Sequence, residues 1–184
     1  DSDDYWLNEN CLRKMADVLD THDSDVAVLK YIKYDERSGK FSKVNSGFNS
    51  ADFLNNEYGL MLNELVSRQL FDSCAWNKVV RAELFRKNDL SFREGIVAED
   101  LDWSARLMLA AKSITLVNDP VYVYRVGRKG SITGTLKLKN LIDTKQSIDN
   151  CLNIDLSQYT DSFRKAYLSY VAYKYVIWMA EGNA

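Results

Sequence analysis

The segment from Phe92 to Lys112 constrains the fold of this chain most, because its pattern changes from a loop to a helix within a few residues. Residues 92–97 are interrupted by Gly95 and have no regular hydrophobic period. From residue 98 onward, apolar side chains recur at the spacing of one helical face, at Leu101, Ala105, Met108 and Leu109. The sequence therefore predicts a loop that leads directly into a helix.

Glu99 and Asp100 lie in the first turn of this predicted helix. Unpaired backbone N–H groups and the positive end of the helix dipole favour ionised carboxylates at that position. An ionised carboxylate at the mouth of a loop is well placed to act as a general base. Acidic residues also cap helices for structural reasons alone, so the pair by itself leaves both roles open.

The first half of the chain combines strand-like and helical patterns. Strands are predicted at residues 26–34 and 41–44, with residues 37–40 as a hairpin connection. One helix is predicted after Asn8 as its N-cap, with a buried face of Leu12, Met15, Val18 and Leu19. A second helix is predicted after Ser50, with a buried stripe of Phe53, Leu54, Tyr58, Met61, Leu62 and Leu65.

The second half continues this alternation. Residues 74–80 read as a short strand and residues 81–87 as a short helix. Strands are predicted at 114–117 and 121–125, separated by a turn at Asn118-Asp119-Pro120. Everything from about Leu136 onward is predicted to be helical. The whole pattern favours an α/β fold with helices at the C-terminal end.

Composition excludes several classes of protein. Twenty-four basic residues against 26 acidic ones give a net charge of −2, so no global attraction to nucleic acid is expected. The three cysteines, Cys11, Cys74 and Cys151, are far apart and lack metal-site spacing, which favours free thiols in a reducing compartment. No run of 18 or more apolar residues is present. We therefore expect a cytoplasmic protein, with contact to the inner face of the membrane left open.

Four segments, in this order, carry a resemblance to a known family: DSDDYW (1–6), AWNKVVRAELF (75–85), FREGIVAEDLDW (92–103) and NDPVYVYRVGRKGSIT (118–133). Together they resemble bacterial family-2 glycosyltransferases over roughly residues 1–133. The resemblance implies a GT-A fold and inverting transfer of a sugar from a nucleotide-diphosphate donor, with Mn2+ or Mg2+ as cofactor. It divides the chain into the C-terminal part of a catalytic domain, 1–133, and a helical extension, 134–184.

The acidic N-terminus looks like the Asp-x-Asp motif of this family. The resemblance implies that Asp3 is the more direct metal ligand and that Asp1 lies nearer the donor ribose or a metal-bound water. A hard cation held by one or two carboxylates and by the phosphates would neutralise the leaving diphosphate. A solvated acidic terminus, or a cluster that caps a helix, would have the same sequence.

The remaining site residues also follow from the resemblance. Asp100 resembles the base that deprotonates the acceptor hydroxyl, and Glu99 its neighbour, which orients the base or the acceptor. Paired carboxylates also occur in glycoside hydrolases, which need no metal pair. The resemblance implies that four further side chains contact the nucleotide-sugar donor: the indole of Trp76, the amide of Asn77 and the basic side chains of Lys78 and Arg125. An aromatic face suits a sugar ring and an amide suits its hydroxyls, although a core tryptophan beside a polar residue, or a solvated basic loop, would look the same.

Two features depart from the family pattern. Some relatives use a late histidine as a further metal ligand, whereas the single histidine here is His22, expected at the surface. The family also builds its nucleotide-binding half before Asp-x-Asp, and no such segment precedes Asp1. We therefore expect this chain to be part of a longer protein and to be inactive by itself.

Three functions remain open from the sequence. The first is a metal-dependent glycosyltransferase that uses a nucleotide-diphosphate sugar, by family habit a UDP-sugar, and a glycan or lipid-linked acceptor in bacterial polysaccharide synthesis. The second is a non-catalytic glycan-binding or interaction module that retains the fold. The third is a partner-binding protein in which the aromatic C-terminal helix forms a homodimer or contacts a membrane surface.

Overall fold

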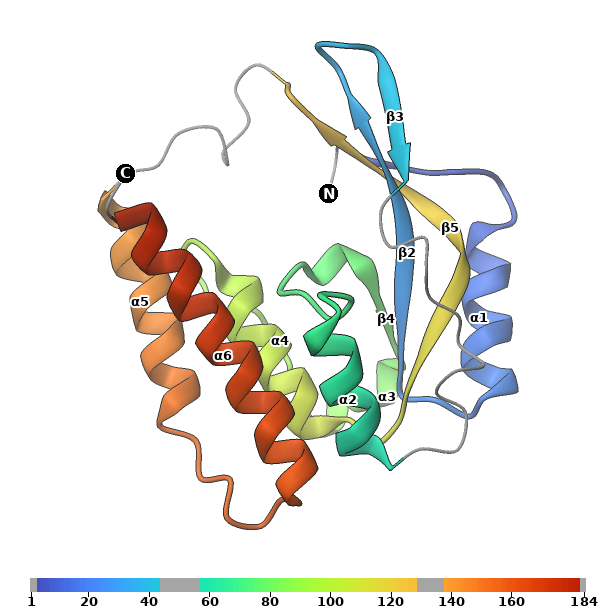
Figure 1. The fold of residues 1–184 in the computed structure, drawn as a ribbon. Helices are drawn as coiled ribbons and strands as arrows, with labels where there is room; N and C mark the ends of the chain where they lie inside the picture. The colour runs from blue at the N-terminus through green and yellow to red at the C-terminus, as the bar shows by residue number, and fades with distance from the viewer. Residues whose placement is uncertain (1–2, 44–56, 129–137, 183–184) are drawn as a thin grey trace. The chain divides into compact units, whose positions relative to one another are not determined.

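The computed structural model describes residues 3–43, 57–128 and 138–182. The chain forms two compact units, each assembled from separate segments (Figure 1). The first comprises Asp1–Asn55, Trp76–Arg81 and Ser113–Thr135, and the second Asn56–Ala75, Ala82–Lys112 and Leu136–Ala184. Strands and helices are both present, which confirms the predicted α/β class. The family-based boundary between residues 133 and 134 stays a prediction.

In its described residues, the first unit contains a mixed sheet of five strands. The strands are β1 (Tyr5–Trp6), β2 (Val26–Asp35), β3 (Lys40–Lys43), β4 (Lys78–Val80) and β5 (Ile114–Val126). Their order is β1-β5-β2-β3, and β4 also pairs with β2. The central pair, β2 and β5, is parallel, whereas the other pairs are antiparallel. The hairpin predicted at residues 37–40 is confirmed, because Asp35 pairs with Lys40 across it.

The turn predicted at Asn118-Asp119-Pro120 is wrong, because β5 continues through it as one strand. The register with β2 moves from Leu29–Val117 to Lys30–Pro120, so Asn118 and Asp119 are extra residues on β5. Such a bulge accommodates turn-forming residues and proline without ending a strand. Local sequence signals do not distinguish a bulge from a turn, since the distinction depends on a partner strand far away in sequence.

Helix α1 (Cys11–Thr21) covers one face of this sheet. The core between them joins side chains of the helix to alternate residues of the strands: Cys11, Met15, Leu19, Ala27, Leu29, Val117 and Val121. The predicted buried position of Leu12 is wrong, since 61% of it is exposed. The helix buries the row at positions 11, 15 and 19, and its N-cap is Asn10 rather than the predicted Asn8.

The second unit is helical. It contains α2 (Tyr58–Ser67), α3 (Ala82–Asn88), α4 (Glu99–Ala110), α5 (Leu138–Leu152) and α6 (Asp161–Gly182). Glu57 caps α2, while Ser50, Phe53 and Leu54 lie outside the described residues. Helix α6 packs against α2, α4 and α5 and fills the centre of the unit with Phe163, Ala166, Tyr167, Tyr170 and Val171. No helix in the described ranges is both long and apolar enough to span a membrane.

Candidate functional site

The acidic N-terminal segment is anchored to β5 through Asp4, which the sequence analysis did not single out. One carboxylate oxygen of Asp4 accepts a hydrogen bond from the Tyr122 hydroxyl at 2.8 Å, and the other accepts from the backbone N–H of Arg125 at 2.8 Å. Burial, followed by the nearby Asp4 carboxylate, raises the pKa of Tyr122, so this hydroxyl keeps its proton and remains a donor. Asp4 therefore fixes the position of the residue before it.

Asp3 presents a partly exposed carboxylate beside two arginines. Its backbone oxygen accepts from Arg125 Nη1 at 2.9 Å, and its Oδ2 pairs with Arg128 Nη2 at 3.1 Å. Arg125 also pairs with the carboxylate of Glu36, the residue directly after β2, so its guanidinium joins the acidic segment to the end of that strand. The Oδ1 atom of Asp3 makes no hydrogen bond within the described residues, and 26% of the side chain is exposed. Asp1 lies outside those residues.

The chemistry of Asp3 fits the divalent cation that the resemblance implies. In the described ranges, no group of three or more His, Cys, Asp or Glu side chains could hold a metal by itself. Mg2+ and Mn2+ bound with a nucleotide, however, commonly take one or two carboxylates and complete their coordination with phosphate oxygens and water. The half-exposed Asp3 can supply one such oxygen, whereas both oxygens of Asp4 are already hydrogen-bonded.

Trp76 lies at the centre of an aromatic cluster on the sheet. It occupies a short 3-10 turn, η2 (Ala75–Asn77), immediately before β4. Its indole stacks on Tyr122 with ring centroids 4.9 Å apart and on Tyr124 with centroids 4.8 Å apart. Tyr31 of β2 meets it edge-on at 4.8 Å. The indole remains half-buried, and its orientation is fixed by three tyrosines on neighbouring strands.

Asn77 and Lys78 are more deeply buried than Trp76 and bind each other. Lys78 Nζ donates to Asn77 Oδ1 at 2.9 Å, and 2% of Asn77 and 8% of Lys78 are exposed. Lys78 pairs with Val28 in the sheet, which fixes its backbone. Buried polar groups of this kind need partners, and each supplies one for the other. Their predicted contact with the donor sugar is not tested by this geometry.

Glu99 and Asp100 occupy the first turn of α4, which confirms the predicted helix start. Both side chains are half-buried. The N-cap residue, Ala98, has a left-handed backbone with φ 63° and makes no side-chain capping bond. The positive end of the α4 dipole therefore lies at the turn that carries these two carboxylates.

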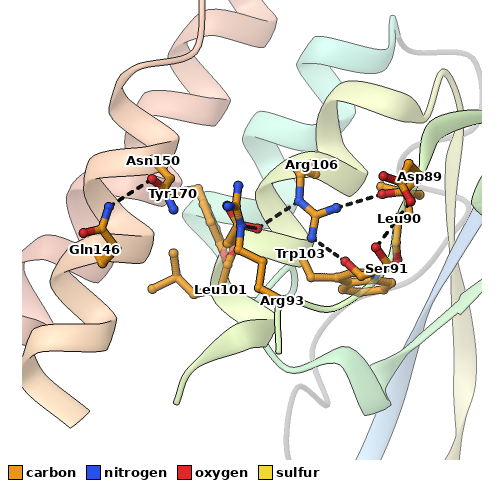
Figure 2. Close-up of polar contacts among 11 residues, drawn as sticks. Asp89, Leu90, Ser91, Arg93, Leu101, Trp103, Arg106, Gln146, Asn150 and Tyr170 are labelled. Atoms are coloured by element: carbon orange, nitrogen blue, oxygen red, sulfur yellow. Dashed lines mark hydrogen bonds and ion pairs between the residues drawn. The ribbon is translucent and has the colours of Figure 1, made fainter. Parts of the chain in front are cut away.

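A third acidic residue on α4, Asp102, forms a buried ionic network that the sequence analysis missed. Its Oδ2 accepts from Arg93 Nε at 2.9 Å and from Arg106 Nε at 2.9 Å. Arg106 also donates to the backbone oxygens of Asp89 and Ser91 at 3.0 and 2.6 Å. Figure 2 shows both arginines, with the guanidinium of Arg106 reaching Asp89 and Ser91. The i, i+4 spacing of Asp102 and Arg106 in the sequence indicates an ion pair on a helix, but it does not indicate that the pair is buried.

The predicted site residues fall into two groups. Asp3 and Arg125 are in contact, and Tyr122 connects their segment to Trp76, because its hydroxyl binds Asp4 while its ring stacks on the indole. Glu99 and Asp100 belong to the other compact unit. The convergence of Asp3 and Asp100 on one sugar therefore stays a prediction.

Comparison with known proteins gives the class of this chain. No protein-family model matches it. It is 34% identical over 143 residues to the glycosyltransferase GlyG of Streptococcus pneumoniae serotype 4, covering 73% of this chain and 44% of GlyG. It is 28% identical over 131 residues to the poly(ribitol-phosphate) beta-N-acetylglucosaminyltransferase TarS of Staphylococcus aureus, covering 71% of this chain and 21% of TarS.

Comparison with solved structures bears on the fold. The crystal structure of S. aureus TarS 1–349 in complex with UDP-GlcNAc superposes with a TM-score of 0.58 and 23% identity, over 86% of this chain and 43% of that one. A second crystal structure of S. aureus TarS 1–349 superposes with a TM-score of 0.57 and 21% identity, over 93% of this chain and 44% of that one. The resemblance is therefore confirmed: this chain is related to bacterial glycosyltransferases and has a GT-A-like fold. It spans less than half the length of these relatives.

Proposed function

We propose that the protein containing this chain is a metal-dependent, inverting family-2 glycosyltransferase of bacterial polysaccharide synthesis. It transfers a sugar from a nucleotide diphosphate, a UDP-sugar such as the one bound by TarS, to a glycan or lipid-linked acceptor. The reaction takes place in the cytoplasm or at the inner face of the membrane. The observation that supports this best is the position of Tyr122, which joins the acidic segment through Asp4 and the aromatic cluster through Trp76.

In this proposal the first unit binds the donor. Asp3, with Asp1, contributes carboxylate oxygens to Mn2+ or Mg2+, which when bound neutralises charge on the departing diphosphate. The exposed guanidinium of Arg128, together with Arg125, offers N–H groups to the phosphates. Trp76 offers an apolar surface to the sugar ring, held in orientation by its tyrosine neighbours.

In the same proposal the second unit activates the acceptor. Asp100 takes the proton of the attacking hydroxyl, and Glu99 orients the base or the acceptor. Both carboxylates lie at the positive end of the α4 dipole, and a general base acts in its ionised form. Attack from the face opposite the leaving diphosphate then gives inversion.

The test uses the full-length protein that contains this chain. Nucleotide sugars are screened for release of nucleoside diphosphate with MnCl2 and with EDTA, first without and then with candidate acceptors. Asp3→Asn and Asp100→Asn are each expected to lower turnover by about 100-fold or more, in keeping with the usual contribution of such groups. Asp119→Asn is the matched control, because that carboxylate is exposed and pairs with Lys14. Normal turnover in both site variants would refute the proposal.

The ion pair between Arg128 and Asp3 favours one alternative, a non-catalytic glycan-binding module. In such a module Arg128, rather than a cation, would neutralise Asp3, and the aromatic cluster around Trp76 would bind sugar. This alternative expects glycan binding that is unchanged by EDTA and lost in Trp76→Ala, with no release of nucleoside diphosphate from any donor.

A further inference from the structure

The turn that leads into Glu99 has an unusual backbone. Gly95 and Ala98 both have positive φ angles, 77° and 63°. For glycine this is inexpensive, but for alanine the left-handed region costs about 1–2 kcal/mol. Two left-handed residues within four positions form a turn that α4 alone does not specify. Contacts from elsewhere in the unit must therefore hold it.

Helix α5 supplies these contacts through one pair of side chains. The Oδ2 atom of Asp143 accepts from the backbone N–H of Val97 at 2.8 Å. Lys139, one helical turn earlier, pairs with the same carboxylate and donates to the backbone oxygen of Gly95 at 3.0 Å. The pair therefore binds a donor and an acceptor of the turn, on either side of Ile96.

The state of Asp143 suits this task. Only 9% of the residue is exposed, so it sits against the turn rather than in solvent. The Lys139 ammonium, followed by the N–H of Val97, holds the pKa of Asp143 below its ordinary value. The carboxylate is thus ionised at neutral pH, and a charge-assisted hydrogen bond of this kind is stronger than a neutral one.

The other end of the same loop is held by a separate network. Arg93 binds Asp102, which lies within α4 itself. The loop between Arg93 and Glu99 is consequently fixed at its beginning by α4 and at its end by α5. Of these two attachments, the one from α5 lies next to the strained Ala98, immediately before Glu99 and Asp100.

We propose that Asp143, assisted by Lys139, is a positioning residue that sets the direction of Glu99 and Asp100 by fixing the Gly95–Ala98 turn. The proposal rests on the proposed function, in which Asp100 is the base. It gives helix α5 a role in the reaction, although no part of α5 is required to touch donor or acceptor.

The chain offers a matched control on the same helix. Lys145 and Asp149 form another i, i+4 ion pair on α5, with half-exposed side chains that bind no loop backbone in the described part of the chain. Asp149→Leu removes an equivalent pair without affecting the turn. Asp143→Leu removes the acceptor of the Val97 N–H and the ion-pair partner of Lys139, whereas Asp143→Asn retains an oxygen that can accept from Val97.

Steady-state kinetics of the full-length protein test the role in the reaction. Asp143→Leu is expected to lower kcat by about 10- to 100-fold with a donor KM within about twofold of wild type, as for a small displacement of a reacting group. Asp143→Asn should recover most of that loss, and Asp149→Leu should match wild type. A kcat of Asp143→Leu equal to that of Asp149→Leu, or an equal rise in KM and fall in kcat, would overturn the proposal.

Hydrogen exchange separates a failure of this proposal from a failure of the proposed function. The Val97 amide should exchange at least about tenfold faster in Asp143→Leu than in wild type or Asp149→Leu, whether or not any sugar is transferred. If the exchange rate of the Val97 amide is unchanged in Asp143→Leu, the proposal that Asp143 fixes the turn is refuted. If Asp143→Leu does not fold, Lys139→Met replaces it in the test. This variant should show a smaller fall in kcat and faster amide exchange near Gly95. No change in either quantity would overturn the proposal.

Discussion

Asp102 is expected to be the most important single carboxylate for the stability of the helical unit. Its side chain is 3% exposed and one of its oxygens binds both Arg93 and Arg106. Replacement by alanine would leave the arginines without their shared partner. Because Arg106 also holds the backbone of Asp89 and Ser91, the loss would extend into the loop before α4.

The expected magnitude follows from the exposure of each partner. Removing one member of a buried ion pair costs about 3–5 kcal/mol, whereas an exposed pair contributes about 0–1 kcal/mol. The Arg106 side chain is 22% exposed, so its pair with Asp102 contributes nearly the full value for a buried pair. The Arg93 side chain is 51% exposed, so its pair with Asp102 contributes very little. We expect Asp102→Ala to lower the free energy of unfolding by about 3 kcal/mol. For a chain of this size that corresponds to a melting temperature lower by about 6–12 °C.

Urea denaturation followed by far-UV circular dichroism measures this difference, with Arg93→Met as the comparison. That variant should cost less than about 1 kcal/mol, because the guanidinium it removes is half in solvent. A loss below about 1 kcal/mol for Asp102→Ala, or a larger loss for Arg93→Met than for Asp102→Ala, would refute the reasoning.

Three further predictions concern packing, strain and pH. Gly59→Ala should destabilise the protein by about 2 kcal/mol in urea denaturation, because the added Cβ would lie 2.5 Å from the backbone nitrogen of Phe163; Gly182→Ala, with open space around it, should not. Ala98→Gly should raise the free energy of unfolding by about 0.5–1 kcal/mol, because relief of the left-handed strain at φ 63° outweighs the conformational entropy that glycine loses on folding. A measured loss of stability would contradict this. Burial, followed by the charge of Asp102, raises the pKa of Cys151 to about 12 from 9.0. Because the unfolded thiol loses its proton first, the stabilisation is present below pH 9 and is lost as pH rises toward 12. The stability of wild type relative to Cys151→Ala should therefore fall by up to about 4 kcal/mol over that range, at about 1.4 kcal/mol for each pKa unit, and an unchanged difference would contradict the assignment.

Much of the local structure was predictable because its causes are local. The start of α4 at Glu99 follows from the hydrophobic period and the change of pattern after Gly95, and the β2–β3 hairpin follows from alternation around a glycine-containing turn. The wrong assignments, the turn at Asn118-Asp119-Pro120 and the buried position of Leu12, concern features that depend on a partner strand or on which helical face meets the sheet.

The types of element, the acid pair at the start of a helix and the order of motifs that relates this chain to glycosyltransferases can all be read from the amino-acid pattern. Which acids bind groups within the fold depends on contacts between distant segments: Asp4 binds Tyr122 and Arg125, Asp102 binds its arginines, and Asp143 binds a turn 46 residues away. A carboxylate has the same chemistry at every position of a sequence. Its role is set by the donors that folding brings to it, and those donors are distant in the chain.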